Sequence, residues 1–545
     1  MRGSQPVYSG PGTVEDTERA RARFYTRPTP AAQRLPYVAP QPLAVIDIGS
    51  NSGRVIVVRV TDLGHLEILS DARVGLRLMR DIDRSGRLGS EALERTVAAL
   101  HDFMAVAAGA GARRTVALAT AAVREASNGT EFVTLLRDRT GLDIRVIDGD
   151  EEARLAFSGA VNGLPVEHGV LVDVGGGSLE LAHFRERRPV RSWTLPLGAL
   201  RLTDMFLDSD PPKQSEIAAL QNHVSRMLDD VGVESLAADE RLVGTGGTIR
   251  NLAKMHRSSV VYPIPRLHGY TIGRKPLREL VARISGRPLS RRTTLPGLSS
   301  DRSDSIAGGA LVVQAAMDAL SAGELTVSGQ GLREGVVYEE TMAAMPSTVE
   351  VRRASLEAIA ARFSTWDSER ARRRTELALA LWDEMRPNGD EIREVLEHAA
   401  TILDVGRSVD YYRRWEHAAE IVVSADLHGF SHRNIAMMAA LIVRAGNRRP
   451  SLDVYSALID GRDRRNIGRG AVLLALADEV ERRIPKGAAV SLERHHGADS
   501  VVLVLPVPHD WNPVELSSRF ERVFGRTLLI EPSDATDFGS AVSLR

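Results

Sequence analysis

The chain has 545 residues, a formal net charge of −1 and no cysteine, and hydrophobic residues make up 43% of it. The near-zero charge excludes an overall field that attracts nucleic acid or a membrane surface, and the missing cysteines exclude disulfides, thiolate metal ligands and cysteine nucleophiles. No apolar run approaches the ~18 residues of a membrane span and the N-terminus has no signal-peptide core, so we expect a cytoplasmic protein of several domains.

The first 60 residues predict a tail followed by a β-hairpin. Residues 1–40 are rich in Pro, Arg, Thr and Ser without periodicity, which is typical of a disordered segment. Leu43–Val60 then has the pattern of an apolar strand ending near Asp47, a turn of small residues and a second strand that carries Arg54. The turn consists of Gly49, Ser50, Asn51 and Ser52.

Residues 66–165 alternate between strand and helix patterns. Strands are expected at Leu66–Leu69, Thr115–Thr120 and Ile144–Ile147. Helices are expected at Ser90–Ala107, with Ser90 as the cap, and at Thr130–Asp138.

Two charged positions in this region have both a structural and a functional interpretation. Arg124 is either a charge on a helix surface or a cation at a cleft. Glu152 follows Asp150 and Glu151 in the first turn of a predicted helix, where acidic residues usually complement the helix dipole. A carboxylate near a phosphate-binding loop instead positions and deprotonates water.

A second hairpin, Gly169–Phe184, repeats the plan of the first. Its strands are joined by Gly175, Gly176, Gly177 and Ser178. Three glycines let backbone N–H groups approach an anion closely, and the carboxylates of Asp173 and Glu180 beside them suit a divalent cation that bridges to phosphate. A single such hairpin is most simply structural, but two copies indicate a duplication into two similar lobes.

A third glycine turn follows in Arg241–Met255, where Gly246 and Gly247 join a strand to a helix and can seat an anion at the helix N-terminus. Arg302 precedes another predicted helix, and Leu325–Val337 reads as a strand and a glycine-rich turn into a helix. The pattern predicts two α/β lobes around a cleft. Long helices follow from about Ser347, and strands are expected at Ala488–Leu492, Val501–Pro506 and Leu528–Pro532.

Eight stretches carry a resemblance to a known family. They are Asp47-Ile-Gly-Ser-Asn-Ser52, Ala119-Thr-Ala-Ala-Val-Arg124, Gly149-Asp-Glu-Glu-Ala-Arg154, Asp173-Val-Gly-Gly-Gly-Ser-Leu-Glu180, Leu197-Gly-Ala-Leu-Arg-Leu202, Gly244-Thr-Gly-Gly-Thr248, Arg302-Ser-Asp-Ser-Ile306 and Ser328-Gly-Gln-Gly-Leu-Arg-Glu-Gly335. The chain resembles the exopolyphosphatase / guanosine pentaphosphate phosphohydrolase (Ppx/GppA) family over about residues 43–338. The Gly-Xaa-Glu-Glu-Ala stretch separates this family from kinases of the same fold.

The resemblance implies an α/β protein with two actin-like, sugar-kinase-like (ribonuclease H-like) lobes around a cleft. The expected division is a tail (1–40), lobe I (41–165), lobe II (166–345), a helical HD-like domain (346–485) and a small α+β piece (486–545). In the HD-like domain Leu403 takes a histidine position, Asp404 remains and Gly446 stands where another histidine is expected, so its metal site is degenerate although His417 fits a ligand position. Arginine clusters there, including Arg370–Arg374, are candidate contacts for a long anion.

The resemblance also implies hydrolysis of a terminal phosphate from inorganic polyphosphate or from guanosine pentaphosphate, by a homodimer. Glu152 matches the base that activates water, and Asp173 and Glu180 match catalytic acids that hold Mg²⁺ with Asp47. The implied phosphate-binding residues are Gly49, Ser50, Asn51, Ser52, Arg54, Arg124, Gly175, Gly176, Gly177, Ser178, Gly246, Gly247 and Arg302. An ATP-dependent kinase or ATPase and a silent phosphate sensor are the alternatives.

Overall fold

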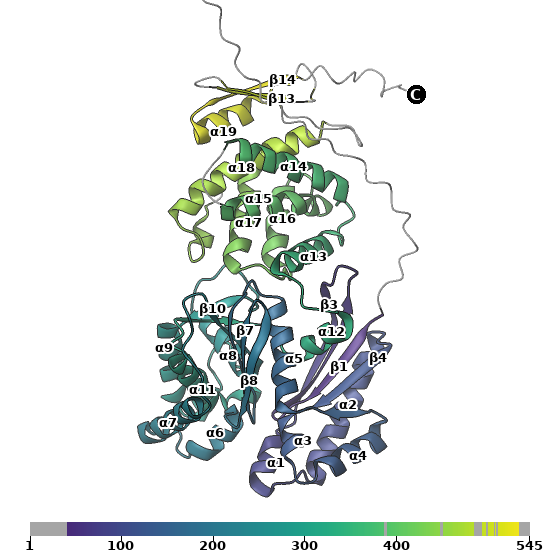
Figure 1. Cartoon of the computed structure of the whole chain (residues 1–545), viewed down its shortest axis with the longest axis vertical. Coiled ribbons are helices and arrows are strands. Elements are labelled where there is room, and N and C mark those ends of the chain that lie inside the picture. Colours follow the sequence, from purple (N-terminus) through teal and green to yellow (C-terminus); the bar gives the residue numbers. More distant parts are fainter. Residues whose placement is uncertain are drawn as a thin grey trace, which may run out of the picture.

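The computed structural model contains two α/β lobes side by side, a helical domain above them and a small sheet at the far end (Figure 1). It describes residues 41–385, 390–446, 451–483, 493–496, 500–505, 507 and 511–532. The expected tail of residues 1–40 and the strand expected at Ala488–Leu492 therefore lie outside the described residues. Among the helices that are described, none is long and apolar enough to cross a membrane.

The first lobe is built on a five-stranded mixed sheet with the order β3-β2-β1-β4-β5. The β1–β2 hairpin is antiparallel, whereas β1, β4 and β5 run parallel. Its elements are β1 (Leu43–Ile48), β2 (Ser52–Val60), β3 (Leu66–Gly75), α1 (Leu78–Ser85), α2 (Ser90–Gly109), β4 (Arg114–Ala119), α3 (Ala121–Glu125), α4 (Gly129–Thr140), β5 (Ile144–Val146) and α5 (Gly149–Asn162). The cap of α2 is Gly89 with no side-chain hydrogen bond, so the expected cap at Ser90 is wrong by one residue.

The second lobe repeats this plan on a six-stranded sheet with the order β10-β11-β9-β6-β7-β8. The β6–β7 hairpin is antiparallel and β6 pairs in parallel with β9, as β1 does with β4. Its elements are β6 (Gly169–Val174), β7 (Leu179–Arg185), β8 (Arg188–Leu195), α6 (Ala199–Phe206), α7 (Gln214–Asp230), β9 (Arg241–Thr245), α8 (Gly246–Arg257), β10 (Tyr270–Gly273), α9 (Arg274–Ser285), α10 (Leu289–Arg292), η1 (Ser300–Arg302), α11 (Ile306–Ala319), β11 (Glu324–Val327) and α12 (Leu332–Thr341). The α/β class with two mixed sheets is confirmed.

Helices α5 and α12 cross between the two sheets, and glycines bring their backbones into contact. A Cβ on Gly159 would lie 1.8 Å from the carbonyl oxygen of Gly331, and one on Gly335 would lie 1.8 Å from that of Leu155. Helix α5 packs against β7 and β8 of the second sheet, whereas α12 packs against β1 of the first. Each of these helices therefore packs against the sheet of the other lobe. This packing holds the lobes together and places the N-terminus of each helix at the cleft.

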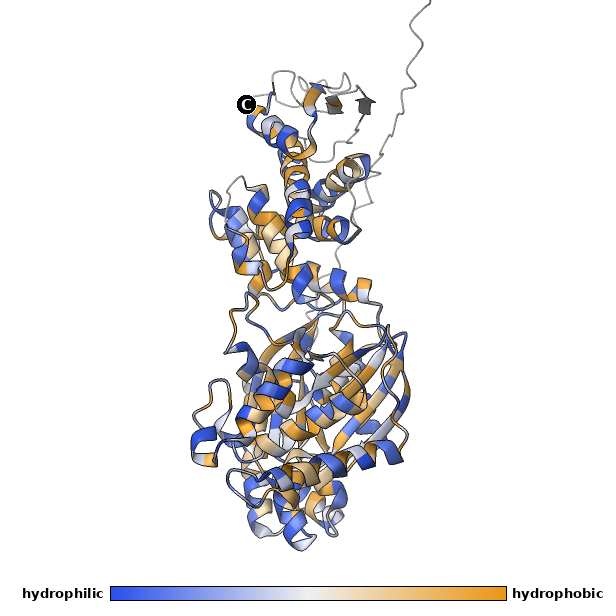
Figure 2. Ribbon diagram, turned by 90° about the vertical axis from the view of Figure 1, so that its left-hand side faces the viewer, coloured by the Kyte–Doolittle hydropathy of each residue, from blue (hydrophilic) through white to orange (hydrophobic). Residues whose placement is uncertain are grey.

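The helical domain has a large apolar core of its own, and Figure 2 shows hydrophobic and hydrophilic residues alternating along its helices. Its elements are α13 (Thr348–Ala360), α14 (Ser368–Met385), α15 (Asp390–Ile402), η2 (Leu403–Ser408), α16 (Arg414–Ser424), α17 (His432–Ala445), η3 (Asp453–Tyr455) and α18 (Gly461–Glu481). The end piece contains β12 (Glu493–His496), β13 (Ser500–Leu505), α19 (Val514–Phe524) and β14 (Thr527–Pro532). Its likeness to HD domains stays a prediction.

Two arginines of α14, Arg373 and Arg374, are buried in this domain, whereas Arg372 is exposed. Arg374 is 0% exposed and donates hydrogen bonds to Asp404 and Asp478, at 2.9 and 3.2 Å. Arg373 donates to Glu481 at 2.8 Å. Arg373 and Arg374 are already neutralised inside the fold, so the expectation of a contact with a long anion is wrong for these two side chains. For the exposed Arg372 it stays a prediction.

Candidate active site

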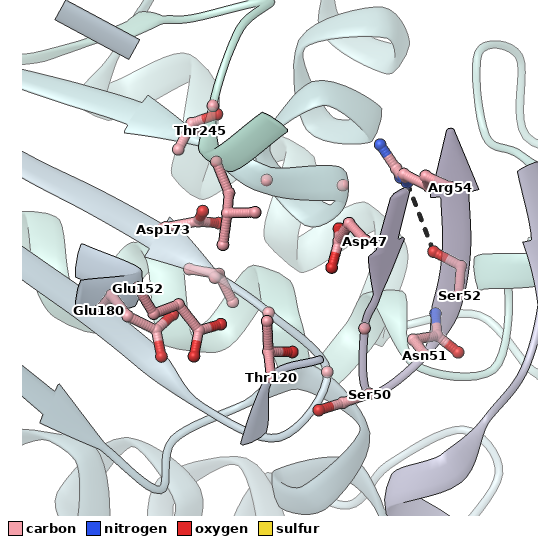
Figure 3. A pocket seen from close by; sticks show the side chains of 18 of the residues that line it. Asp47, Ser50, Asn51, Ser52, Arg54, Thr120, Glu152, Asp173, Glu180 and Thr245 are labelled. Atoms are coloured by element: carbon pink, nitrogen blue, oxygen red, sulfur yellow. Dashed lines mark hydrogen bonds between the residues drawn. The ribbon is translucent and has the colours of Figure 1, made fainter. Parts of the chain in front are cut away.

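The three glycine turns and the starts of α5 and α12 converge on one pocket between the lobes (Figure 3). The β1–β2 turn comes from the first lobe, and the β6–β7 and β9–α8 turns come from the second. The lining residues are Asp47, Gly49, Ser50, Asn51, Ser52, Arg54, Thr120, Glu152, Asp173, Val174, Gly175, Gly176, Ser178, Glu180, Thr245, Gly246, Gly247, Arg250, Arg302, Gly331, Leu332, Arg333 and Glu334. Of the predicted site residues, Gly177 and Arg124 do not line it.

Glycine is required where the loops approach one another. A Cβ on Gly176 would lie 3.1 Å from the Cβ of Asn51, so the two hairpin turns are in contact across the cleft. Gly246 has φ +89°, which side chains rarely adopt, and its Cβ would lie 2.3 Å from Oδ1 of Asp173. The sequence folds this way because strands of alternating or apolar residues end at turns without bulky side chains.

Five acidic residues line the pocket, and four of them, Asp47, Glu152, Asp173 and Glu180, were predicted. Asp47 and Asp173 lie near the ends of β1 and β6, the first strand of each hairpin, and face the cavity from either side (Figure 3). Glu180 is paired with Asp173 across the β6–β7 hairpin. Glu152 enters from the first turn of α5, which Asp148 caps by accepting a hydrogen bond from the Glu151 backbone N–H, and its carboxylate lies beside that of Glu180.

Burial raises the pKa of all four carboxyl groups, because removal from water disfavours the charged form. It raises the pKa of Glu152 to about 7 and that of Asp173 to about 6. The pKa of Glu180 is raised well above its ordinary value by burial and then by the neighbouring charges of Glu152 and Asp173. Such values near neutrality suit a group that must exchange protons during turnover.

Arg124 lies behind the pocket wall and contacts Glu152 directly. Its Nη1 donates to Oε2 of Glu152 and to the carbonyl oxygen of Ile147, both at 2.9 Å. The guanidinium therefore orients the Glu152 carboxylate and lowers its pKa against the larger effect of burial. A direct contact of Arg124 with phosphate stays a prediction.

Four guanidinium groups line the pocket, two of which were not predicted. Arg54 and Arg302 were expected, whereas Arg250 of α8 and Arg333 of α12 were missed. Burial and the neighbouring cations lower the pKa of Arg54, Arg250 and Arg302, the last to about 10. A signal existed in the sequence: Arg250 follows Gly247 by one helical turn, and Arg333 follows the Gly329–Gly331 turn. Thr120, Thr245 and Glu334 carried no comparable signal.

The acidic side chains of the pocket are candidate ligands for Mg²⁺. The described residues contain no group of three or more His, Cys, Asp or Glu side chains arranged to hold a metal ion. Mg²⁺ does not require one, because it keeps several waters and takes one or two carboxylates together with substrate phosphates. The carboxylates of Asp47, Asp173 and Glu180 line the pocket, and Oε1 of Glu180 is buried without a hydrogen-bond partner among the described residues. The residues present therefore fit Mg²⁺.

Comparison with known proteins identifies the family. The model of the Ppx/GppA phosphatase family matches residues 56–344, which include two of the three glycine turns and the start of α5. The chain belongs to the Ppx/GppA phosphatase family. It is therefore a phosphoanhydride hydrolase, and the predicted family and enzyme class are confirmed. A second model, Ppx/GppA phosphatase, domain III, matches residues 351–515, which relates the helical domain to this family as well.

Relatives and solved structures agree with this assignment. Exopolyphosphatase 1 of Mycobacterium leprae is 34% identical over 303 residues, which are 55% of this chain and 89% of the relative. Exopolyphosphatase 1 of Mycobacterium tuberculosis is 32% identical over 302 residues, 55% of this chain and 88% of the relative. The structure of an exopolyphosphatase-like protein matches with a TM-score of 0.51 at 25% identity, over 55% of this chain and 97% of that one. An exopolyphosphatase from Cytophaga hutchinsonii, at 22% identity and TM-score 0.50, shares the fold over 55% of this chain and 97% of its own.

Proposed function

We propose that this enzyme is a Mg²⁺-dependent exopolyphosphatase that removes the terminal phosphate from inorganic polyphosphate. The proposal rests on the separation of an acidic end and a cationic end in the pocket. Glu152 and Glu180 lie side by side at one end, whereas Arg54 lies at the opposite end, beyond Asp47 (Figure 3). An acidic end suits the attacking water, and a cationic end suits a chain of phosphates. Phosphoryl transfer depends chiefly on such positioning and charge neutralisation.

In the proposed reaction Glu152 is the general base. Its carboxylate takes a proton from water as the water oxygen bonds to the terminal phosphorus, and the bridging P–O bond breaks on the opposite side. Inorganic phosphate leaves, and the remaining chain is one phosphate shorter. Arg124 holds the carboxylate in place at 2.9 Å, and a pKa of about 7 lets it accept a proton near neutral pH.

The chain's remaining groups bind and neutralise the substrate. The backbone N–H groups of the glycine turns, including those at the N-terminus of α8, suit phosphate oxygens. One or two of the carboxylates of Asp47, Asp173 and Glu180 would hold Mg²⁺ together with substrate phosphates, and the bound ion would supply positive charge to the phosphoryl oxygens.

The pocket favours polyphosphate over a nucleotide. Within the part of the chain that the structure describes, its lining contains no aromatic side chain on which a guanine base could stack. Ring stacking is a common source of base affinity. Hydrolysis of guanosine pentaphosphate is therefore expected as the weaker activity.

The test is to measure phosphate release from long-chain polyphosphate, guanosine pentaphosphate and ATP side by side, with Mg²⁺ and with excess chelator. We expect the highest kcat/KM on polyphosphate and loss of activity with chelator. A preference for the nucleotide would reverse the substrate assignment, and full activity in chelator would exclude Mg²⁺.

The helical domain takes no part in the proposed reaction. In support of this, Arg374 is ion-paired with both Asp404 and Asp478, so these carboxylates are not free to bind a metal ion. A homodimer in the cytoplasm is part of the same proposal, and light scattering of the purified chain tests its oligomeric state.

A further inference from the structure

A set of cations extends beyond the pocket on the side away from Glu152 and Glu180. Arg54 of β2 lines the pocket, and its direct partner across the antiparallel β2–β3 pair is Arg73. Arg73 is not part of the pocket lining and is exposed to solvent. The two strands therefore carry positive charge from the inside of the cleft to its outer rim.

Helix α8 carries a matching pair on the other lobe. Arg250 lines the pocket, and Lys254 follows it by four residues, which places both on one face of the helix. At 1.5 Å per residue, Lys254 lies about 6 Å further along the helix axis. Lys254 is exposed, and no hydrogen bond or ion pair joins its Nζ to any other described residue.

A further cation, Arg302, lies at the third glycine turn, next to Gly247. It is buried and sits directly on Gly247, where an added Cβ would lie 2.1 Å from its Nη2. Its Nε has no hydrogen-bond partner among the described residues. A buried guanidinium with an unused donor, at the N-terminus of a helix, is a binding group for an anion.

The charged neighbours that most affect Lys254 are cations. The neighbours that lower the pKa of Lys254, after partial burial, are Arg250, Arg73, Arg257 and Arg54, all of them cations. Arg302 has two acidic neighbours, Asp173 of the pocket and Asp301, which is ion-paired with Arg73. Like charges gathered in this way are unfavourable unless an anion lies among them.

We propose that Lys254 and Arg73 form an outer subsite for linear polyphosphate and set the preference of the enzyme for long chains. This inference rests on the proposed function. With the terminal phosphate at the Glu152 end, the following phosphates contact Arg54, Arg250 and Arg302, and later phosphates reach Lys254 and Arg73. Tripolyphosphate ends before this rim. In guanosine pentaphosphate a ribose follows the third phosphate of the 5′ chain, so its linear phosphate chain ends before the rim.

The subsite replaces the surface that the sequence suggested for a long anion. Arg373 and Arg374 of α14 are paired inside the helical domain, whereas Lys254 is exposed beside the pocket residue Arg250, and Arg73, although paired with Asp301, is exposed beside Arg54. A chain of phosphates therefore needs no contact with the helical domain to gain affinity with length.

The experiment compares Lys254→Gln with Lys275→Gln, an exposed lysine of α9 outside the pocket lining, on tripolyphosphate and on long-chain polyphosphate. In Lys254→Gln the ratio of kcat/KM for the long chain to that for tripolyphosphate falls about three- to five-fold, as expected for one exposed ionic contact. Adding Arg73→Gln lowers the ratio further. The dependence of log KM on log salt for the long chain becomes shallower by about 0.7 for each lost contact.

The ratio in Lys275→Gln stays at the wild-type value, and circular dichroism shows that all variants are folded. An unchanged ratio in the folded Lys254→Gln variant, or an equal loss on both substrates, overturns the subsite and leaves the proposed function intact. If wild-type enzyme hydrolyses neither polyphosphate, the proposed function fails and the subsite fails with it.

Discussion

Nη1 of Arg124 lies 2.9 Å from Oε2 of Glu152, although the two residues are 28 positions apart in the chain. Arg124 belongs to the short helix α3 after β4, and Glu152 belongs to the first turn of α5. The contact places a fixed positive charge behind the proposed base. It makes the pKa of Glu152 a balance between burial, which raises it, and Arg124, which lowers it.

Removal of Arg124 is expected to change the pH profile of the enzyme. In Arg124→Gln the pKa of Glu152 rises above its wild-type value of about 7, because the charge that lowers it is gone. More of the base is then protonated at neutral pH, so kcat falls there and recovers in part as the pH is raised. The measurement is kcat against pH from 5.5 to 9, with the exposed Arg113→Gln as the control. An acidic limb at the wild-type position would contradict the assigned role.

Glu152→Gln is expected to lower kcat by about 10²–10⁴, since it removes the general base. The amide keeps the shape of the side chain and none of the phosphate contacts is lost, so KM should change only a few-fold. Glu151→Gln is the matched control, because its carboxylate pairs with Arg145 outside the pocket lining. Single-turnover phosphate release on both variants gives the comparison, and near-wild-type turnover in Glu152→Gln would exclude this residue as the base.

Gly246→Ala is expected to damage both stability and activity. The positive φ of +89° strains an alanine by about 1–3 kcal/mol, and the new Cβ would lie 2.3 Å from Oδ1 of Asp173. Gly75→Ala is the control, because nothing lies within 4 Å of its Cβ position and its φ is unrestricted. Chemical denaturation and kcat/KM on polyphosphate are measured for both. Equal behaviour of the two variants would show that the turn tolerates a side chain.

Buried histidines at the junction of the three large parts are expected to make the fold sensitive to acid. His65 of the first lobe packs against His428 of the helical domain with ring centroids 5.1 Å apart, and His428 packs against His268 of the second lobe at 5.4 Å. Burial, and then the His428 charge, lower the pKa of His65 to about 3 and that of His268 to about 4. Among the charged groups near His65, Asp426 raises its pKa and Arg362 lowers it.

The lowered pKa values determine how the stability of the fold changes with pH. A group whose folded pKa lies below its unfolded value of 6.5 costs nothing above pH 6.5, and it destabilises the fold progressively as the pH falls toward the folded value. His65→Phe removes one such group while keeping a ring. The slope of unfolding free energy against pH should fall by about 1.4 kcal/mol per pH unit between pH 6 and 4. His101→Phe on the exposed face of α2 is the control, and an unchanged slope in His65→Phe would refute the prediction.

The sequence by itself determined the local parts of this enzyme. Each hairpin follows from an apolar strand, a turn without bulky side chains and a second strand, and all of these are neighbours in the chain. The same holds for the β9–α8 turn, because Gly246 and Gly247 interrupt the strand where a helical pattern begins. Carboxylates at fixed positions in these motifs also indicated the family.

Only the tertiary structure decided which charges meet. Arg250 lines the pocket, whereas Arg374 is buried against Asp404, although both are arginines inside helices. The side of a helix that becomes buried depends on the elements that pack against it, which are remote in the chain. The raised pKa of Glu152 has the same origin, since the packing of the two lobes removes its carboxylate from water and brings Arg124 to it.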